Sequence, residues 1–489
     1  MKNSAVLSCI VCLLILSTTD AGDWNQWRGS SRNGVDVDSP ALVSSLPDSG
    51  LSPVWVAKAN IPGAKSGGWG SPVVADGKVY LFTHQKEKLR EGDLPPKKFP
   101  WLPPEKRVGM SDEEYAEYEV KRRDEDEARG KFYRFDETTY CLDAASGKTL
   151  WTNLFTSVYT RFMQSGSPAV VDGKLYILGA GRVARCIHAQ TGKDVWKQKL
   201  PGEFRDQFLQ SSFVVVDGVA IVLAVQLFGL DADTGSILWQ TNEDTESQLH
   251  TSPVVWSSAA GSRVICNIPG GRTLCVDPKS GEEYWRVNSQ AGHSTPIVVG
   301  DLLLTYGSSR KGGVRCFELS DEAAEHKWTC TRTADSGSSP VVVGDHVYVQ
   351  GDRRVACISL ADGSEQWLAQ LDLNRPRYTS LVAADEKVIY GFEGLLCFAA
   401  DASEYKLLMN AKIDKDGLLA EEASFRKMLN IDELEKTAEG QKDAERIWRQ
   451  NIGNGGPLPC ATPAMADGRI YFRLKDGIAC YDLRAGRPE

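Results

Sequence analysis

The chain repeats one short pattern of apolar and polar positions along most of its length. In its clearest copy, residues 166–198, a short apolar run leads through an Asp-Gly turn into an alternating strand, and a third strand leads through a Thr-Gly turn to Trp196. Alternation with a period of two predicts β-strands, and glycine accepts the positive φ that tight turns require. The pattern therefore predicts a unit of four antiparallel strands.

Eight copies of this unit follow one another. Where nothing is inserted, successive copies open 40 to 45 residues apart, which is the length of one four-stranded propeller blade. They open at Ser71-Pro72, Ser167-Pro168, Ser212-Phe213, Ser252-Pro253, Thr295-Pro296, Ser339-Pro340, Ser380-Leu381 and Thr462-Pro463. Six copies end on Trp151, Trp196, Trp239, Trp285, Trp328 and Trp367, and the seventh has Leu407 near that place. We predict an all-β fold, an eight-bladed β-propeller of four-stranded antiparallel blades.

The eighth copy has three strands, because the chain stops soon after residue 482. Residues 51–56, with Trp55, look like a fourth strand without the three before it. This N-terminal strand should complete the last blade and close the ring, which removes an open sheet edge. Residues 22–489 should thus form one domain.

Two inserts interrupt the repeat, at residues 84–137 and 414–451. The first has a proline-rich strap and then a capping box at Ser111, which opens a helix to about Arg129 with 13 charged residues of 19. The second shows near-helical apolar spacing, so we expect two amphipathic helices. In a four-stranded blade, loops from second to third strand and from blade to blade emerge at one end. Both inserts should therefore lie on one face, as a lid over blades 7, 8 and 1.

Residues 1–21 have a lysine near the start, a short apolar run and small residues before position 22, which is typical of a signal peptide. We expect an exported protein, periplasmic or secreted, without a transmembrane segment. The formal net charge of −9 argues against nucleic acid as a partner. We expect a monomer.

The chain has twelve cysteines, an even number that would suit disulfides in an exported protein. Most of them recur at one third-strand position of different blades, too far apart to be bridged. We predict buried thiols there. The pairing of Cys266, Cys330 and Cys460, which fall outside this position, stays open.

The segment Trp24-Asn25-Gln26-Trp27-Arg28-Gly29 and closing runs such as Thr191-Gly192-Lys193-Asp194-Val195-Trp196 resemble exported proteins of the PQQ-like (pyrroloquinoline-quinone-like) propeller repeat class. The resemblance covers nearly all of the chain from Trp24 to Asp482 except the inserts. It implies a propeller but no single activity, because the class includes quinoprotein dehydrogenases and non-catalytic scaffolds such as the outer-membrane assembly lipoprotein BamB.

The loops before each first strand should form the mouth of the central channel. Two positions before each opening stand Trp69, Ser165, Gln210, His250, His293, Gly337, Tyr378 and Cys460. From these and their neighbours, the candidate ligand-binding residues of this funnel are Trp69, Arg161, Gln164, Gln210, His250, His293, Arg377 and Tyr378. Aromatic faces beside amides, imidazoles and guanidiniums are typical of a pocket for a polar small molecule or glycan. The alternative is that these residues bond only to loops and water.

The sequence has no H-x-x-x-H, no paired-carboxylate spacing and no G-x-S-x-G elbow, so we assign no catalytic or metal-binding residues. It also lacks the adjacent cysteine pair of quinoprotein alcohol dehydrogenases and a C-x-x-C-H haem site. We therefore predict an exported, non-catalytic scaffold without a cofactor, which binds a protein partner or a small polar or glycan ligand through the lidded face and the funnel. The alternative is a PQQ-dependent oxidoreductase with Ca²⁺, or another enzyme with its site in the funnel.

Overall fold

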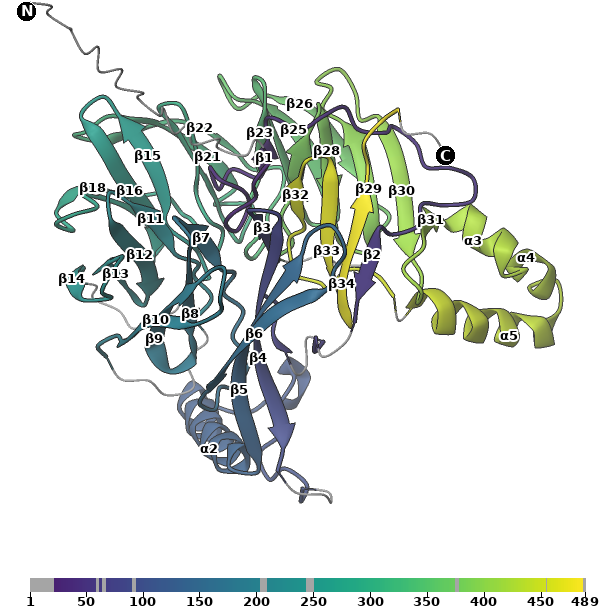
Figure 1. Ribbon diagram of the computed structural model, residues 1–489, viewed down its shortest axis with the longest axis horizontal. Coiled ribbons are helices and arrows are strands. Elements are labelled where there is room, and N and C mark those ends of the chain that lie inside the picture. The colour runs from purple at the N-terminus through teal and green to yellow at the C-terminus, as the bar shows by residue number, and fades with distance from the viewer. Residues whose placement is uncertain are drawn as a thin grey trace, which may run out of the picture.

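The computed structural model describes residues 22–58, 61–63, 67–89, 94–202, 209–242, 250–373, 378–453 and 455–486. These residues form eight β-sheets arranged in a ring, which confirms the eight-bladed propeller (Figure 1). The expected signal peptide lies outside the described residues.

Each blade consists of four consecutive antiparallel strands, apart from the last. Blade 1 contains β3 (Val73–Ala75), β4 (Lys78–Lys88), β5 (Tyr133–Asp143) and β6 (Thr149–Thr156). Blade 2 contains β7 (Ala169–Val171), β8 (Lys174–Gly179), β9 (Val183–His188) and β10 (Asp194–Lys199). Blade 3 contains β11 (Val214–Val216), β12 (Val219–Ala224), β13 (Gln226–Asp231) and β14 (Ile237–Gln240). Blade 4 contains β15 (Val254–Ser258), β16 (Gly261–Ile268), β17 (Arg272–Val276) and β18 (Glu283–Asn288). Blade 5 contains β19 (Ile297–Val299), β20 (Leu302–Tyr306), β21 (Val314–Leu319) and β22 (Ala324–Cys330). Blade 6 contains β23 (Val341–Val343), β24 (His346–Gly351), β25 (Arg354–Ser359) and β26 (Glu365–Gln370). Blade 7 contains β27 (Val382–Ala384), β28 (Lys387–Tyr390), β29 (Gly394–Ala399) and β30 (Leu407–Ile413), flanked by β1 (Val35–Asp36) and β31 (Leu419–Glu421).

The last blade joins the two ends of the chain. It contains β32 (Ala464–Ala466), β33 (Arg469–Leu474) and β34 (Gly477–Asp482), and its fourth strand is the N-terminal β2 (Trp55–Ala57). Trp55 pairs with Cys480 in an antiparallel register. The predicted closure of the ring by an N-terminal strand is confirmed.

The serine or threonine that opens every repeat has a structural role. The backbone N–H of each one donates to the side-chain hydroxyl of its counterpart in the next blade, over 2.9 to 3.4 Å. Eight such hydrogen bonds close a circle from Ser71 round to Thr462 and back. Because a buried N–H without a partner is costly, this circle explains why a hydroxyl recurs at each opening.

The closing tryptophans join neighbouring blades at the outer part of the ring. Seven of them donate their indole N–H to a backbone carbonyl in the next blade, over 2.8 to 3.1 Å. The donors are Trp55, Trp151, Trp196, Trp239, Trp285, Trp328 and Trp367. In blade 7 the residue opposite the third-strand cysteine is Met409, so Leu407 is not the equivalent position. The turn between β29 and β30 is two residues longer than the corresponding turn of blade 2, because Met409 lies twelve positions after Cys397 whereas Trp196 lies ten positions after Cys186.

Glycine in the third turn of a blade allows the indole of the preceding blade to approach. Gly192 has φ +70°, and a Cβ atom there would lie 2.6 Å from the Trp151 ring. Gly173, in the first turn of the same blade, has φ +71° and no atom within 4 Å of such a Cβ. The two glycines share a left-handed backbone but differ in their surroundings.

This pair supports a prediction. We expect Gly173→Ala to lower the free energy of unfolding by about 1 kcal/mol, the cost of the left-handed backbone alone. Gly192→Ala should cost about 2 to 4 kcal/mol, because steric overlap with the indole adds to that strain. Urea denaturation of both variants measures the difference. Equal losses would contradict a close contact between glycine and indole.

The ten cysteines that the structure describes are free thiols. Cys186 faces Trp196 across its strand pair, as Cys141 faces Trp151, and burial raises the pKa of both thiols to about 12. These two side chains act as small apolar groups, as predicted for the third-strand position.

The first insert is shorter than predicted. Strands β4 and β5 stay paired as far as Lys88 and Tyr133, so they include the ends of the segment 84–137 that was assigned to the insert. Between them lie a 3₁₀ turn (Pro104–Lys106) and helix α2 (Asp112–Gly130). The Ser111 hydroxyl accepts from the Glu114 N–H and the Glu114 side chain accepts from the Ser111 N–H, which confirms the capping box.

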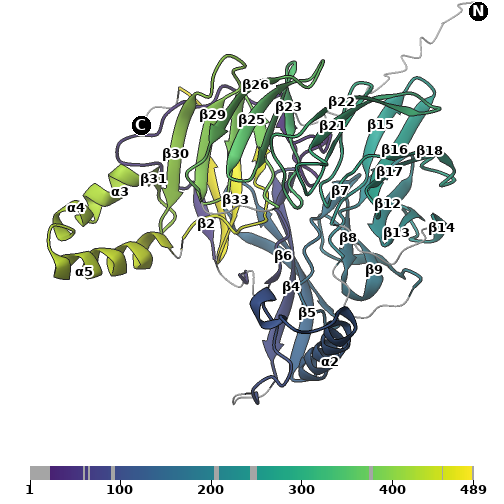
Figure 2. The ribbon, with the colours of Figure 1, turned by 180° about the vertical axis from the view of Figure 1, so that it is seen from behind.

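The second insert contains β31 and three helices instead of two, α3 (Glu422–Met428), α4 (Ile431–Leu434) and α5 (Ala438–Trp448), followed by a π-helical turn (Arg449–Gly453). The apolar spacing could not reveal the left-handed Asn430, which separates the first two helices. Figure 1 and Figure 2 show these helices extending sideways from blade 7, whereas α2 lies at one end of the ring. The expected joint lid is therefore wrong, because the α3–α5 arm lies away from the axis.

Residues 22–36, which we call the plug, pack against the inner strands at the centre of the ring. Trp24 forms a β-bridge with Val74 of blade 1, and β1 pairs in parallel with β27 of blade 7. Arg28 bonds to the Pro340 carbonyl of blade 6, and Arg32 bonds to carbonyls next to β11 of blade 3. The plug thus joins five blades, since the Asn25 carbonyl also accepts from blade 2.

Candidate functional site

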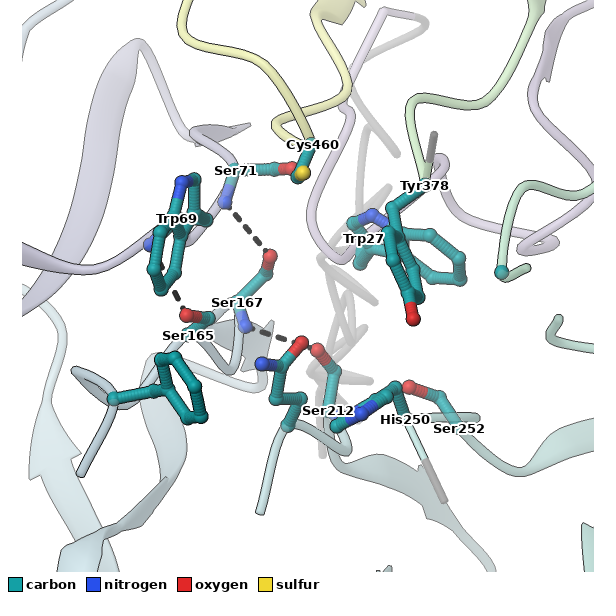
Figure 3. Close-up of a pocket in the computed structure, with 13 residues that line it drawn as sticks. Trp27, Trp69, Ser71, Ser165, Ser167, Ser212, His250, Ser252, Tyr378 and Cys460 are labelled. Carbon is teal, nitrogen blue, oxygen red and sulfur yellow. Dashed lines mark hydrogen bonds between the residues drawn. The ribbon is translucent and has the colours of Figure 1, made fainter. Parts of the chain in front are cut away.

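A pocket of about 270 Å³ lies on the propeller axis (Figure 3). Its lining comes from the loops that enter the first strands, together with one plug residue. The lining residues are Trp27, Trp69, Ser71, Phe162, Ser165, Ser167, Gln210, Ser212, His250, Ser252, Gly337, Tyr378 and Cys460. Within the described part of the chain, neither insert contributes to this lining.

The predicted funnel is largely brought together. Of the eight positions that stand two residues before an opening, all but His293 line the pocket. The eight-fold repeat explains this arrangement, because it places equivalent positions in a circle around the axis.

Trp27 was not among the predicted residues. It belongs to the plug, whose backbone turns sharply at Arg28 and Gly29, with φ of +65° and +81°. The segment Trp24-Asn25-Gln26-Trp27-Arg28-Gly29 was the available signal, but it has no β periodicity that would place it inside the ring. Trp69 and Tyr378 lie on opposite sides of the cavity (Figure 3).

The backbone is strained at two lining residues. Tyr378 has φ +65° and Cys460 has φ +73°, values that side chains with a Cβ rarely adopt. The Tyr378 N–H donates to the Asp335 carboxylate over 3.2 Å, and the Cys460 N–H donates to the Thr379 hydroxyl over 3.0 Å. These bonds hold both side chains toward the pocket.

Three rings pack together at one side of the pocket. The imidazoles of His250 and His293 have centroids 4.5 Å apart, and the Tyr378 ring lies 5.9 Å from His250 and 6.3 Å from His293. Burial, and then the neighbouring His293, lowers the pKa of His250 to about 4, and burial lowers the pKa of His293. Both imidazoles are therefore neutral at pH 7.

The lowered pKa predicts acid lability that depends on His250. The unfolded chain binds a proton at this residue near pH 6.5 and the folded chain near pH 4, so its contribution to stability is lost as the pH falls between these values. At pH 5 the loss should be about 2 kcal/mol. We expect His250→Gln to lose less stability than the natural chain between pH 7.5 and pH 5, as measured by urea denaturation. Equal losses in the two proteins would contradict a buried neutral imidazole.

The other predicted residues lie elsewhere. Arg161 faces a separate pocket beside α2. Gln164 is fully buried, and its backbone N–H donates to the His84 Nδ1 atom over 3.1 Å, so it holds the loop in place. His293 packs behind His250. Arg377 lies outside the described residues.

The central pocket has an uncharged lining among the described residues, with neither a carboxylate nor a lysine or arginine. Pyrroloquinoline quinone has three carboxylates and would need cationic groups and Ca²⁺ ligands. The described lining does not fit this cofactor. The buried carboxylate of Asp335 accepts hydrogen bonds from the backbone N–H groups of Gly337, Ser338 and Tyr378. No group of three metal-ligating side chains occurs within the described residues.

Aromatic rings, serine hydroxyls and an amide are what remain to contact a ligand. Such a lining can hold an uncharged group by stacking and hydrogen bonds. None of the helices in the described ranges has the length and apolar character needed to cross a membrane.

Comparison with known proteins agrees with the propeller architecture. The chain is 26% identical over 220 residues to the outer membrane protein assembly factor BamB of Nitrosomonas eutropha, a match that covers 42% of this chain and 50% of that protein. It is 24% identical over 304 residues to BamB of Yersinia pestis, with 57% and 73% covered. This chain thus matches half the length of the first relative.

Solved structures with this fold include the quinohemoprotein alcohol dehydrogenase from Comamonas testosteroni, with a TM-score of 0.56, 12% identity and coverage of 96% of this chain and 82% of that one. A europium-containing methanol dehydrogenase has a TM-score of 0.51 at 12% identity, with 80% and 85% covered. At such identities the likeness concerns the fold alone. The family model described as outer membrane protein assembly factor BamB matches residues 136–414, more than half of the chain, and this protein therefore belongs to that family.

Proposed function

We propose that this protein is an exported, non-catalytic propeller scaffold that binds a protein partner through the end of the ring where the central pocket opens. Membership of the BamB family supports a role in assembly with other proteins. The signal-like residues 1–21 support export to the periplasm or beyond.

The uncharged, aromatic lining of the central pocket carries this proposal. Four serines of the hydroxyl circle (Ser71, Ser167, Ser212 and Ser252) line the same cavity as the rings of Trp69, Phe162 and Tyr378. The serine hydroxyls accept from backbone N–H groups, so their role in the ring is structural as well. A group that enters this pocket is therefore recognised by shape and stacking rather than by charge. An aromatic or aliphatic side chain of a partner fits this chemistry.

A sugar ring is the second candidate. Trp27 and Trp69 offer flat rings, and Gln210 offers an amide on the same cavity. Stacking on one face with hydrogen bonds at the edge is a common way to hold a neutral saccharide. The pocket of about 270 Å³ has room for a small polar ligand of this kind.

The two ends of the ring differ in the length of their loops and in the apolar side chains that they expose. The end with the central pocket carries α2 and the exposed side chains of Val158 and Phe162, which are 46% and 48% exposed. The other end carries short turns such as those at Gly173 and Gly192. Interaction surfaces favour exposed apolar groups, so the proposal assigns the partner to the pocket-bearing end.

The test is thermal denaturation of the purified protein with neutral saccharides, with peptides rich in tryptophan and leucine, and with pyrroloquinoline quinone plus Ca²⁺. A ligand at 100 times its dissociation constant adds about 2.7 kcal/mol of stability. We expect a saturable shift with one of the uncharged ligands. The shift should be lost in Trp69→Ala and kept in the control Trp101→Ala, whose side chain is 58% exposed and outside the pocket lining.

A saturable shift with the quinone and Ca²⁺ alone would contradict the proposal and favour an oxidoreductase. The same holds if the shift with an uncharged ligand survives in Trp69→Ala, because the ligand would then bind elsewhere.

A further inference from the structure

A second pocket, of about 200 Å³, lies between the β4–β5 hairpin and α2. We call it the cationic pocket, because four side chains among its described lining residues are basic and one is acidic. The lining residues are Lys86, Leu94, Lys97, Asp126, Arg129, Gly130, Tyr133, Tyr159 and Arg161. Four positive charges against one negative charge give a formal +3 here, in a chain whose net charge is −9.

The acidic groups around this pocket already have partners. Asp126 forms an ion pair with Lys97 and lies 4.0 Å from Arg122. Glu125 accepts from the backbone N–H groups of residues 98 and 99, over 2.9 and 2.8 Å. Glu119 pairs with Arg122 at 2.5 Å. These three carboxylates of α2 are thus engaged, and the one carboxylate among the described lining residues does not balance four cations.

The cations are held close to one another. The Lys86 ammonium lies 4.0 Å from the centroid of the Tyr133 ring, and an Arg129 guanidinium nitrogen donates to the Pro95 carbonyl over 2.6 Å. Burial, and then the neighbouring Lys97, lowers the pKa of Lys86, with Arg129 acting in the same direction and Asp126 opposing. An anion placed here would relieve this repulsion.

The cationic pocket and the central pocket are lined by residues that are adjacent in the sequence. Arg161 lines the cationic pocket, and the following residue, Phe162, lines the central pocket. One partner segment could therefore place an acidic side chain and an uncharged side chain on this end at once. A small inorganic anion would use only one of the two sites.

We infer that the cationic pocket binds acidic side chains of a protein partner. The inference rests on the proposed function and names the chemistry of the partner segment. Charge complementarity is the argument, since glutamate or aspartate carboxylates match lysine and arginine at short range.

The test is fluorescence polarisation of a labelled peptide of ten glutamates with the purified protein at low ionic strength. The protein has a net charge of −9, so any attraction must come from a local positive site. We expect saturable binding that weakens as salt is added. The double variant Lys86→Gln/Arg161→Gln should bind roughly tenfold or more weakly, because it removes two of the four cations that line the pocket.

The matched control is Lys279→Gln, which removes an exposed cation from a turn at the other end of the ring and should bind the peptide as the natural chain does. A ten-glutamine peptide should not bind. Melting curves establish that each variant is folded. Equal affinity of the double variant and the natural chain, or no peptide binding, would overturn the inference, as would binding of anionic phospholipid vesicles in preference to the peptide.

Failure here is distinguishable from failure of the proposed function. One outcome is that the peptide fails to bind while an uncharged ligand still stabilises the natural chain and not Trp69→Ala. In that case the inference that the cationic pocket binds acidic side chains is wrong, and the scaffold proposal stands.

Discussion

Replacing Arg28 with alanine is expected to lower the free energy of unfolding by about 3 to 5 kcal/mol. The side chain is fully buried, and its Nη2 atom donates to the carbonyls of Pro340 and Asn33 over 2.5 and 3.0 Å. Its removal leaves the buried Pro340 carbonyl and the partly buried Asn33 carbonyl without this donor, and a cavity at the centre of the ring. Urea denaturation followed by tryptophan fluorescence measures the loss.

The control is Lys279→Ala, an exposed cation that should change stability by less than about 0.5 kcal/mol. A loss below about 1 kcal/mol for Arg28→Ala would show that the plug does not hold the blades together.

The second large effect is expected for Trp196→Ala, again about 3 to 5 kcal/mol. The indole N–H donates to the Ala232 carbonyl over 3.0 Å, and the ring packs against Gly235 and lies 6.1 Å from the Tyr176 ring. The substitution therefore removes a hydrogen bond and a large buried surface between blades 2 and 3. Thermal and urea denaturation should agree on the loss.

Two variants separate these contributions. Trp196→Phe keeps most of the ring but leaves the carbonyl without its donor, so it should cost about 1 to 3 kcal/mol. Trp101→Ala removes an indole that is 58% exposed and should cost less than about 1 kcal/mol. If Trp196→Ala costs no more than Trp101→Ala, the tryptophans do not join the blades.

The propeller could be predicted because its signals repeat. Seven blades have a glycine in the first turn, all eight open on a serine or threonine, and all but one end on a tryptophan, so these weak patterns support one another. Met409 was missed because the turn before it is two residues longer than in blade 2, and without a tryptophan at this place the sequence does not mark the partner of the third-strand cysteine.

The plug could not be predicted in the same way. It occurs once, makes only a two-residue strand, and is held by arginine side chains that bond to backbone carbonyls of distant blades. Buried arginines are rare, so Arg28 and Arg32 read as surface residues in a sequence. Their bonds to the Pro340 and Ser212 carbonyls span 312 and 180 positions along the chain.

The candidate site shows the same difference between features that repeat in every blade and features that occur once. Residues placed by the repeat, such as Trp69, Gln210 and Tyr378, line the central pocket as the topology predicts. Residues chosen for their chemistry on the neighbouring loop do not, because Gln164 holds that loop and Arg161 faces α2. Position in the repeat predicts location, whereas residue type alone does not.

Photocrosslinking tests most directly whether the pocket-bearing end binds a protein. A photoreactive phenylalanine analogue replaces Phe162 or Val158, both exposed at that end, or Gln190, exposed in a turn at the other end, in cells that make this protein. We predict one covalent adduct with the same protein from positions 162 and 158 and none from position 190. Adducts from position 190 alone, or no adduct from any of the three positions, would contradict a scaffold that binds its partner through this end of the ring.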